Sequence, residues 1–369
     1  MKINCIMALA MLSMAVSSGE EPAVAPEQVQ AAVENPAESS SVETLKKEAR
    51  LGSAKAQYEL GMRYLKGDGV RESLLDASIL FQKAEEQGIP NAAEMYKRCQ
   101  STLKEIAMAA YAGDAESQYK LGCYSVDTED IWASTLADGL CWLRDAHKGG
   151  ISKAKEKMEQ TINKLREQAD KKDPRALHAL GELYYGGSGV EQDYAQALKW
   201  YQQAAELGHI QAQCNVGEFY LQGLGVEKDA VVAIKYFRMS AEAGCAMAIN
   251  NLAACHAHGE GVEKNLEEAA KLYRKAAELG EPLAQGNLGV CYLRGEGVAK
   301  DAAEAVKWLS LAAQYGMPFA LYYLGNCYDE GTGVPQDKVK AKQLWRQAFE
   351  HGYAPALKPL IQAENTPKE

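Results

Sequence analysis

A motif of the form Gly-x-Gly-Val occurs five times in the second half of the chain, and each copy begins 36 residues after the one before. The first glycines of the copies are Gly187, Gly223, Gly259, Gly295 and Gly331. A second register keeps the same step, because alanine returns every 36 residues from Ala176 to Ala356. A chain of 369 residues can hold several ordinary domains or one long array. The period favours an array, in which each unit is one supersecondary motif stacked on its neighbours.

The apolar pattern inside each unit is helical. After Ala212, Val216 and Phe219 follow at i+4 and i+7, on one face of a helix. Gly223 supplies the backbone freedom that ends this first helix and turns the chain. Asp229 has the chemistry of an N-cap residue for a second helix. Each unit is therefore predicted to be a helix hairpin, which cannot bury its apolar face alone.

Two more positions of the hairpin repeat along the array. A small residue in the middle of the first helix, such as Gly217, lets a neighbouring helix approach closely. Its counterparts are also small: Gly181, Ala253, Gly289 and Gly325. The N-cap residue also returns in every unit: Asp193, Asp229, Asn265, Asp301 and Asp337.

These motifs, best seen in "NLGVCYLRGEGVAKDAAEAVKWLSLAAQYG" from Asn287, closely resemble the Sel1-like repeat, a relative of the tetratricopeptide repeat. The resemblance implies an all-α fold, a right-handed α/α superhelical solenoid of helix hairpins. It covers five regular repeats in residues 166–353. A sixth unit begins at Ala54, and a degraded seventh begins at Ala115, without the Gly-x-Gly-Val turn.

The spacing of these units predicts the remaining organisation. Residues 43–165 hold the two irregular units, each followed by an insert of helix-compatible sequence that we expect to form a long helix. Residues 354–369 contain Pro359, which leaves room for a short capping helix and a polar tail.

The N-terminus has the layout of a secretory signal peptide in residues 1–18. One basic residue, Lys2, precedes an apolar run that ends at Val16 and is followed by small residues. The run is shorter than the roughly 20 residues that span a bilayer, although a membrane anchor is the alternative. Residues 19–42 lack Lys and Arg and are rich in Glu, Pro, Ala and Ser, which predicts a disordered acidic tether.

A cleaved signal peptide predicts an exported protein. The compartment is the periplasm if the source is a Gram-negative bacterium, and the secretory pathway if it is eukaryotic. No later stretch is long and apolar enough to be an integral membrane segment. The formal net charge of −10 argues against a nucleic-acid partner, which requires a basic face.

Eight cysteines remain after the signal peptide, which in an oxidising compartment raises the question of disulfides. Cys255, Cys291 and Cys327 share one phase, so they lie on successive helices about 8–10 Å apart, too far for a bridge. We interpret them as buried small hydrophobic residues. Cys123 and Cys141 form the candidate disulfide, because they can face each other across the degraded hairpin.

The sequence offers little support for catalysis, a metal or a cofactor. Some cysteine-rich relatives of the Sel1-like type are regarded as β-lactamases or penicillin binders, so a β-lactamase-like or cell-wall-peptide-binding protein is the alternative function. The Ser-x-x-Lys pattern occurs at Ser117 and Ser152, but the accompanying Ser-Asp-Asn and Lys-Thr-Gly motifs are missing. His256 and His258 have no third ligand at zinc-site spacing, and His256 takes the phase of aromatic residues elsewhere.

A polar face of the first helices is the remaining candidate site. Asn215, Asn251 and Asn287 share one phase, and amides both donate and accept hydrogen bonds, which suits binding of an extended peptide backbone. The full predicted binding face is Gln211, Asn215, Glu218, Gln222, Asn251, His258, Asn287, Arg294, Asn326 and Glu330. The alternative is that asparagine is tolerated on an exposed face or helps to pack the hairpin.

The sequence thus predicts a non-catalytic exported scaffold or adaptor, which binds a protein or peptide partner in a concave groove of the first helices. The resemblance implies roles in signalling, complex assembly or envelope maintenance. Self-association through an exposed end of the solenoid is a further prediction.

Overall fold

The computed structural model of the protein describes residues 41–127 and 133–365. Within these ranges the regular structure is entirely helical, with eighteen α-helices and one 3-10 turn, which confirms the predicted all-α fold. The predicted signal peptide, 1–18, and nearly all of the predicted tether, 19–42, lie outside the described residues. None of the described helices combines the length and apolar character needed to cross a bilayer.

The chain forms two compact units. The first contains the described residues up to Lys171 together with Glu182–Gln192, and the second contains Lys172–Gly181 and the described residues from Asp193 onward. The boundary therefore falls inside one helix, α9 (Pro174–Gly186).

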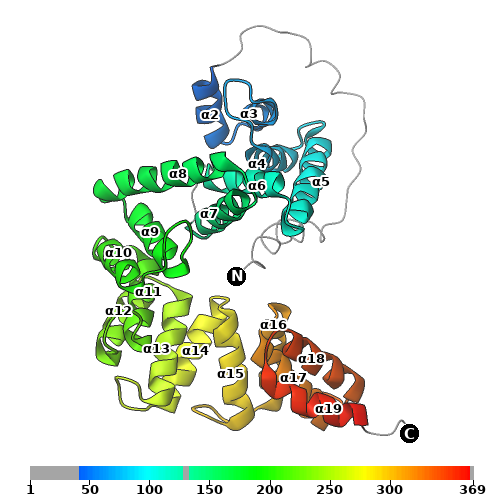
Figure 1. Ribbon diagram of the computed structural model, residues 1–369. Helices are drawn as coiled ribbons and strands as arrows, with labels where there is room; N and C mark the ends of the chain where they lie inside the picture. The colour runs from blue at the N-terminus through cyan, green and yellow to red at the C-terminus, as the bar shows by residue number, and fades with distance from the viewer. Residues whose placement is uncertain (1–40, 128–132, 366–369) are drawn as a thin grey trace. The chain divides into compact units, whose positions relative to one another are not determined.

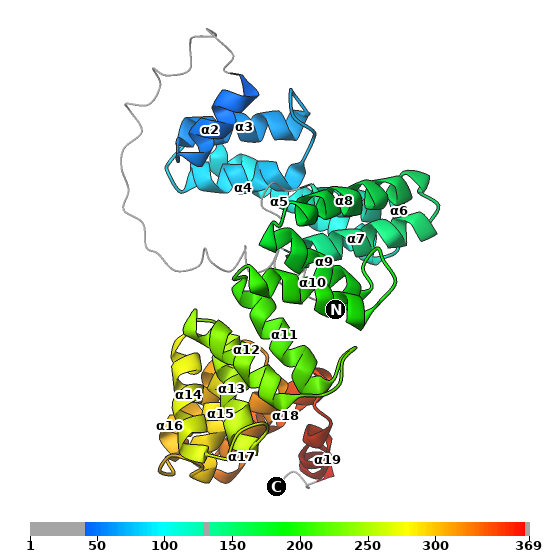
Figure 2. The ribbon, with the colours of Figure 1, turned by 90° about the vertical axis from the view of Figure 1, so that its left-hand side faces the viewer.

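The first unit holds two hairpins and the two inserts (Figures 1 and 2). Its helices are α2 (Val42–Arg50), α3 (Ala54–Lys66), α4 (Leu74–Glu85), α5 (Ala92–Tyr111), α6 (Ala115–Val126), α7 (Ala133–Lys148) and α8 (Ser152–Asp170). Helices α3 and α4 form one hairpin and α6 and α7 the other, so the degraded unit keeps its helix pair. The inserts are separate helices: α5 packs on α4 and α6, and α8 packs on α7 and α6.

The second unit is a stack of hairpins. Its helices after α9 are α10 (Tyr194–Glu206), α11 (Ile210–Gln222), α12 (Ala230–Glu242), α13 (Ala246–His258), α14 (Leu266–Glu278), α15 (Pro282–Arg294), α16 (Ala302–Gln314), α17 (Pro318–Glu330), α18 (Lys338–Glu350), η1 (Ala354–Ala356) and α19 (Leu357–Asn365). We name the odd-numbered helices α9 to α17 the A helices, and the even-numbered helices α10 to α18 the B helices. The B helices α12, α14 and α16 each pack between the A helix of their own repeat and that of the next, and α18 packs between α17 and α19.

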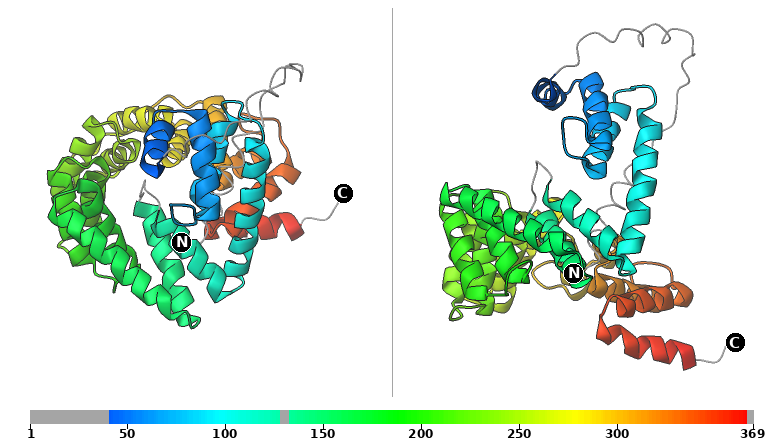
Figure 3. Two further views of the ribbon diagram at one scale, coloured as in Figure 1. Left: turned by 90° about the horizontal axis from the view of Figure 1, so that it is seen from above. Right: turned by 45° about the horizontal axis from the view of Figure 1, so that its top comes forward.

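The A helices line the inner side of this stack. Neighbouring A helices contact each other directly, α13 with α15 and α15 with α17. In the described part of the unit, neighbouring B helices do not contact each other as closely as neighbouring A helices do. The A helices are therefore closer together than the B helices, and the stack curves toward the A helices. Figure 3 shows this curvature along the second unit, from green through yellow to red.

Capping residues set the ends of the helices as the sequence predicts. The side chain of Asp229 accepts hydrogen bonds from the backbone amides of Val231 and Val232, which have no partner inside the helix. The four counterparts, Asp193, Asn265, Asp301 and Asp337, cap their B helices in the same way. Gly223 ends α11 with φ 74°, in the left-handed region that residues with a Cβ atom rarely adopt, which is why glycine occupies this position.

Close approach between the two helices of a hairpin depends on a small residue. A Cβ atom at Gly217 would lie 2.6 Å from the ring of Phe237, which is fully buried on α12. The prediction that Gly217 lets a neighbouring helix approach closely is confirmed, and that helix is the second one of the same hairpin. Other repeats use the same pairing: Gly61 with Phe81, Gly181 with Tyr201, Gly289 with Leu309 and Gly325 with Trp345.

The C-terminal end of the stack is covered by α19. Leu360 of α19 and Trp345 of α18 belong to one apolar cluster and are both buried. The predicted capping helix of residues 354–369 thus corresponds to η1 and α19, and residues 366–369 lie outside the described residues.

Candidate binding surface on the A helices

The ten residues of the predicted binding face all lie on four A helices of the second unit. They occupy four positions of the 13-residue A helix, counted from its first residue. Gln211 is at the second position, the ladder residues Asn215, Asn251 and Asn287 are at the sixth, Glu218 and Asn326 at the ninth, and Gln222, His258, Arg294 and Glu330 at the last. These positions follow one face of a helix, and their side chains are half-buried or exposed.

The three ladder asparagines are bound to the preceding A helix. Asn287 donates to Oδ1 of Asn250 at 3.0 Å. Asn251 donates to Glu218 at 2.9 Å and lies 3.8 Å from the sulfur of Cys214. Each ladder amide therefore bonds or contacts a residue on the previous A helix, and it acts as a spacer between repeats.

The first ladder residue, Asn215, contacts a histidine. Its Nδ2 atom lies 3.2 Å from Nε2 of His178, whose ring stacks on His209 with 4.4 Å between centroids. Burial, followed by the neighbouring His209, lowers the pKa of His178 to about 3. For the amide to donate, Nε2 of His178 must be unprotonated, and the lowered pKa favours that state.

The ladder changes character at α17. Tyr323 takes the asparagine position, and its hydroxyl accepts a hydrogen bond from Arg294 at 2.8 Å. The ring of Phe319 packs on Gly286, which has the phase of Asn250. Asn326 points to its own hairpin, because Oδ1 accepts a hydrogen bond from Nε1 of Trp345 at 2.9 Å. The amide face of α11–α15 is thus replaced by aromatic side chains.

The last position of the A helices forms an exposed row. Gln222, His258, Arg294 and Glu330 are all exposed and lie on successive helices of the stack. We name these four residues the exposed row. It presents a neutral amide, an imidazole, a guanidinium and a carboxylate in that order.

A second row, at the start of the A helices, was missed by the sequence analysis. Its members share the second position with Gln211, and they are Met247, Leu283 and Phe319. Leu283 is 41% exposed, and the other two are half-buried. Tyr322 adds to this apolar row beside Tyr323, with 5.3 Å between ring centroids. The signal was present in the sequence, because these residues keep the 36-residue step.

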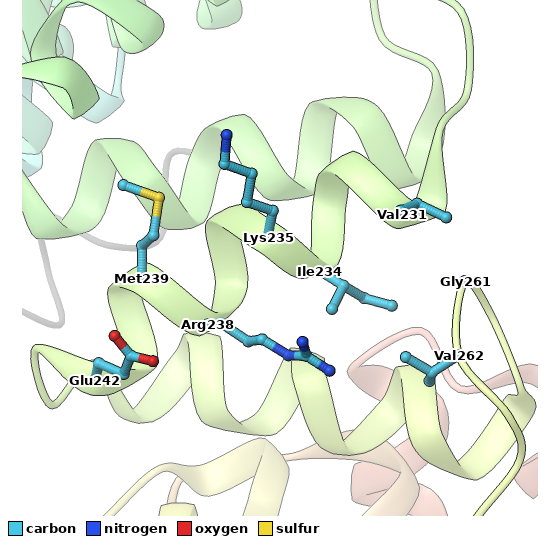
Figure 4. Close-up of a pocket in the computed structure, with 8 residues that line it drawn as sticks. All are labelled: Val231, Ile234, Lys235, Arg238, Met239, Glu242, Gly261 and Val262. Atoms are coloured by element: carbon cyan, nitrogen blue, oxygen red, sulfur yellow. The ribbon is translucent and has the colours of Figure 1, made fainter.

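The other side of the repeats has a shallow hollow beside α12 (Figure 4). Its volume is about 410 Å³, and its lining is Val231, Ile234, Lys235, Arg238, Met239, Glu242, Gly261 and Val262. This lining has no serine, cysteine or histidine to act as a nucleophile or base.

The two Ser-x-x-Lys patterns lie on helix surfaces of the first unit. Ser117 is in the first turn of α6, where its backbone amide donates to the capping side chain of Asp114. Ser152 is exposed, and Lys155 of the same pattern lies 3.9 Å from Glu159 in an exposed ion pair. In the described residues, neither serine therefore lies in a cleft beside a lysine that could activate it as a nucleophile.

The candidate disulfide between Cys123 and Cys141 is not formed in the structure. Both are free thiols with different neighbours. Cys123 is hydrogen-bonded to Tyr119 one turn earlier on α6, whereas Cys141 lies 3.3 Å from the hydroxyl of Ser188. The thiols are on the two helices of one hairpin, but each is directed to its own partner.

The three cysteines that share one phase of the repeat, Cys255, Cys291 and Cys327, are buried as predicted. Cys255 and Cys327 are 1% and 2% exposed, and Cys291 is 8% exposed. Burial raises the pKa of each of these thiols to about 11. They act as small apolar residues in the core of the A helices.

Comparison with known families and structures agrees with this architecture. The Sel1 repeat matches six stretches, residues 54–89, 174–209, 210–245, 246–281, 282–316 and 318–353, which make up more than half of the chain. The degraded hairpin of α6 and α7 is not among them. A search of curated proteins found no match.

Two solved structures show the same fold. The chain is 32% identical to a Sel1 repeat protein from Oxalobacter formigenes, over 62% of this chain and 91% of that one, with a TM-score of 0.53. It is 28% identical to a protective antigen of uropathogenic Escherichia coli that displays an SLR fold, with a TM-score of 0.50. That match covers 89% of this chain, which spans 60% of the length of the antigen. From its six matched repeats and its stacked hairpins, the chain belongs to the Sel1 repeat family.

Proposed function

We propose that this protein is a non-catalytic scaffold that binds an extended segment of a partner protein across the A helices of its second unit. Sel1-repeat proteins generally act as protein-interaction scaffolds. The observation that carries the proposal is the exposed row, which places four chemically different side chains at one position of four successive helices.

The geometry of the stack suits an extended ligand. Packed helices lie about 8–10 Å apart, and an extended chain advances about 3.3 Å per residue. A segment crossing the A helices therefore meets a new helix at about every third residue. On this path Arg294 pairs with an acidic side chain of the partner, and Glu330 pairs with a basic one three residues further on.

The apolar row and the exposed row would contact different parts of the partner. The apolar row of Met247, Leu283 and Phe319 lies at the start of the A helices, and the exposed row lies at their end. The ladder asparagines between the rows have their donors engaged with the preceding helix, so they hold the helices at a fixed spacing. We expect partner affinity to come from the two rows, and the ladder to provide rigidity.

A capture experiment tests the proposal directly. The bait is the full chain, used to capture partners from an extract of the native host, followed by mass spectrometry. The test variant carries Gln222→Ala, His258→Ala, Arg294→Ala and Glu330→Ala. The matched control carries Lys235→Ala, Arg238→Ala and Glu242→Ala, exposed residues of the hollow in Figure 4.

The proposal expects the test variant to lose the captured partner and the control to retain it. Circular dichroism melting must show that both variants fold. A folded test variant that captures the same partner as the wild type would contradict the proposal. Incubation of the purified protein with a chromogenic β-lactam tests the alternative function, and we expect no turnover.

Export is a separate proposal, supported by the signal-peptide layout of residues 1–18. In a Gram-negative host we expect the mature protein in the periplasm, with an N-terminus near Ser17 to Gly19. Fractionation of cells and N-terminal sequencing of the recovered protein test this. A cytoplasmic protein that retains Lys2 would contradict it.

A further inference from the structure

Two cysteines of the second unit pack in one apolar cluster, although they are 31 residues apart in the sequence. The equivalent positions of two other repeats contact each other, His178 with His209 and Tyr322 with Tyr353. Cys214 is on α11 and is fully buried, and Cys245 is the N-cap residue of α13 and is half-buried. The thiol of Cys214 donates a hydrogen bond to the sulfur of Cys245. Both sulfurs lie in the apolar cluster around Phe237. The pair thus joins one repeat to the start of the next.

The surroundings give the two thiols different properties. The interaction with Cys214 lowers the pKa of the Cys245 thiol. The same interaction, together with burial, raises the pKa of Cys214. Cys245 is therefore the better nucleophile of the two, and Cys214 holds its proton.

The exposure of the two side chains also indicates that Cys245 reacts before Cys214. Cys245 is half-buried at the end of a turn, whereas Cys214 has no exposed surface. A reagent from solution can reach the sulfur of Cys245 first. Cys214 is then the thiol in contact with whatever is attached to Cys245.

We propose that Cys245 and Cys214 form a thiol–disulfide exchange site, in which Cys245 attacks a small-molecule disulfide and Cys214 resolves the product. In the first step the Cys245 thiol loses its proton to water, and its thiolate bonds to one sulfur of the external disulfide, whose S–S bond breaks and releases one thiolate. That thiolate takes the proton of Cys214. The sulfur of Cys214 then attacks Cys245, the mixed disulfide breaks, and the second half leaves as a thiolate, which is protonated by water.

The exchange balances in electrons and atoms. The two protein thiols lose two electrons and two hydrogens and become one disulfide, and the external disulfide is reduced to two thiols. The product links α11 to the N-terminus of α13 and closes a loop around α12. A closed loop lowers the entropy of the unfolded chain, so oxidation fixes the spacing of two A helices.

This link acts on the candidate binding surface. Asn251, a ladder residue, lies 3.8 Å from the sulfur of Cys214 and donates to Glu218 on the same helix. The site stands independently of the proposed function, because its chemistry needs only the two thiols and the external disulfide.

The test equilibrates the full-length protein with excess oxidised glutathione. The reaction is quenched with acid, remaining thiols are alkylated under denaturing conditions, and the digest is mapped by mass spectrometry. We expect a peptide pair joined through Cys214 and Cys245, with the intact mass lowered by two hydrogen atoms. Cys255 and Cys327, which are also buried, serve as internal controls and should be recovered alkylated.

Two variants separate the roles. Cys214→Ala should stop at the mixed disulfide, with one glutathione on Cys245, and Cys245→Ser should carry neither the bridge nor that adduct. Recovery of both Cys214 and Cys245 fully alkylated from the wild type would overturn the proposal, and so would a bridge from either one to another cysteine. The wild-type map alone decides this, even if a variant fails to fold.

Discussion

The side-chain amide of Asn287 donates to Oδ1 of Asn250 at 3.0 Å, although the two residues are 37 positions apart and belong to neighbouring A helices. The repeat has a period of 36 residues, so the amide contacts the position one residue before its own counterpart. The same offset joins Asn215 to His178 and Asn251 to Cys214. This recurring contact holds adjacent repeats together, and it can be measured.

A double-mutant cycle on Asn250 and Asn287 should show energetic coupling between two repeats. Asn250 is 5% exposed, so loss of its partner leaves a buried polar group unsatisfied. We expect each single change to alanine to lower the free energy of unfolding by about 1–2 kcal/mol. The double variant should cost about 1 kcal/mol less than the sum of the singles. Urea unfolding followed by circular dichroism measures all four proteins, and additive costs would show that the bond is not coupled.

Gly217→Ala should destabilise the hairpin of α11 and α12. The new Cβ would lie 2.6 Å from the ring of Phe237 and 3.1 Å from the carbonyl oxygen of Ala233, and one of these contacts is backbone. Overpacking of this kind costs about 1–3 kcal/mol, more than the gain of about 1 kcal/mol that alanine gives in a helix interior. Thermal unfolding checks the prediction. Glu242→Ala, an exposed change on α12, is the control and should leave the midpoint nearly unchanged.

The hairpin architecture was predictable because its determinants are local and periodic. Asp229, Gly223 and Gly217 each act within one unit, on a helix end or on the facing helix of the same hairpin. Their type and spacing therefore follow from backbone sterics and capping chemistry, which the sequence shows directly.

The roles of the candidate site residues were less predictable, because they depend on contacts between units. The ladder asparagines were predicted to face a partner, but their donors are engaged with the preceding helix through an offset set by how the helices cross. The positions of Cys214 and Cys245 also meet in two other repeats, as His178 with His209 and as Tyr322 with Tyr353. Because the residue type at these two positions changes from repeat to repeat, periodicity of residue type could not reveal the contact. Cys123 and Cys141 lie on two paired helices, but each side chain is directed to another neighbour, which the pairing of the helices does not determine.

The three phased cysteines should resist thiol reagents in the folded protein. Burial raises the pKa of Cys255, Cys291 and Cys327 to about 11, so at pH 8 each buried thiol carries very little thiolate. We expect slow alkylation by iodoacetamide under native conditions and complete alkylation in urea. Peptide mapping after timed quenching measures each site. Rapid native labelling of Cys255 would contradict its place in the core.

Acid should weaken the second unit through His178. The pKa of this histidine is lowered from 6.5 to about 3, first by burial and then by His209. Above pH 6.5 the ring is neutral in both the folded and the unfolded chain, and it makes no difference to stability. Below pH 6.5 the unfolded chain takes up a proton that the folded chain refuses, so stability is lost progressively down to about pH 3. At pH 5 this loss is about 2 kcal/mol for one histidine.

The variant His178→Asn isolates this effect, because asparagine occupies the same phase at Asn250 and there accepts a hydrogen bond from a ladder amide. We expect the wild type to lose more stability than the variant between pH 7.5 and pH 5, by about 2 kcal/mol. Urea unfolding at the two pH values gives the difference, and it cancels contributions from carboxylates that both proteins share. An equal loss in the two proteins would mean that His178 takes up its proton in the folded state as readily as in the unfolded state. In that case the Asn215 contact would not require a neutral imidazole.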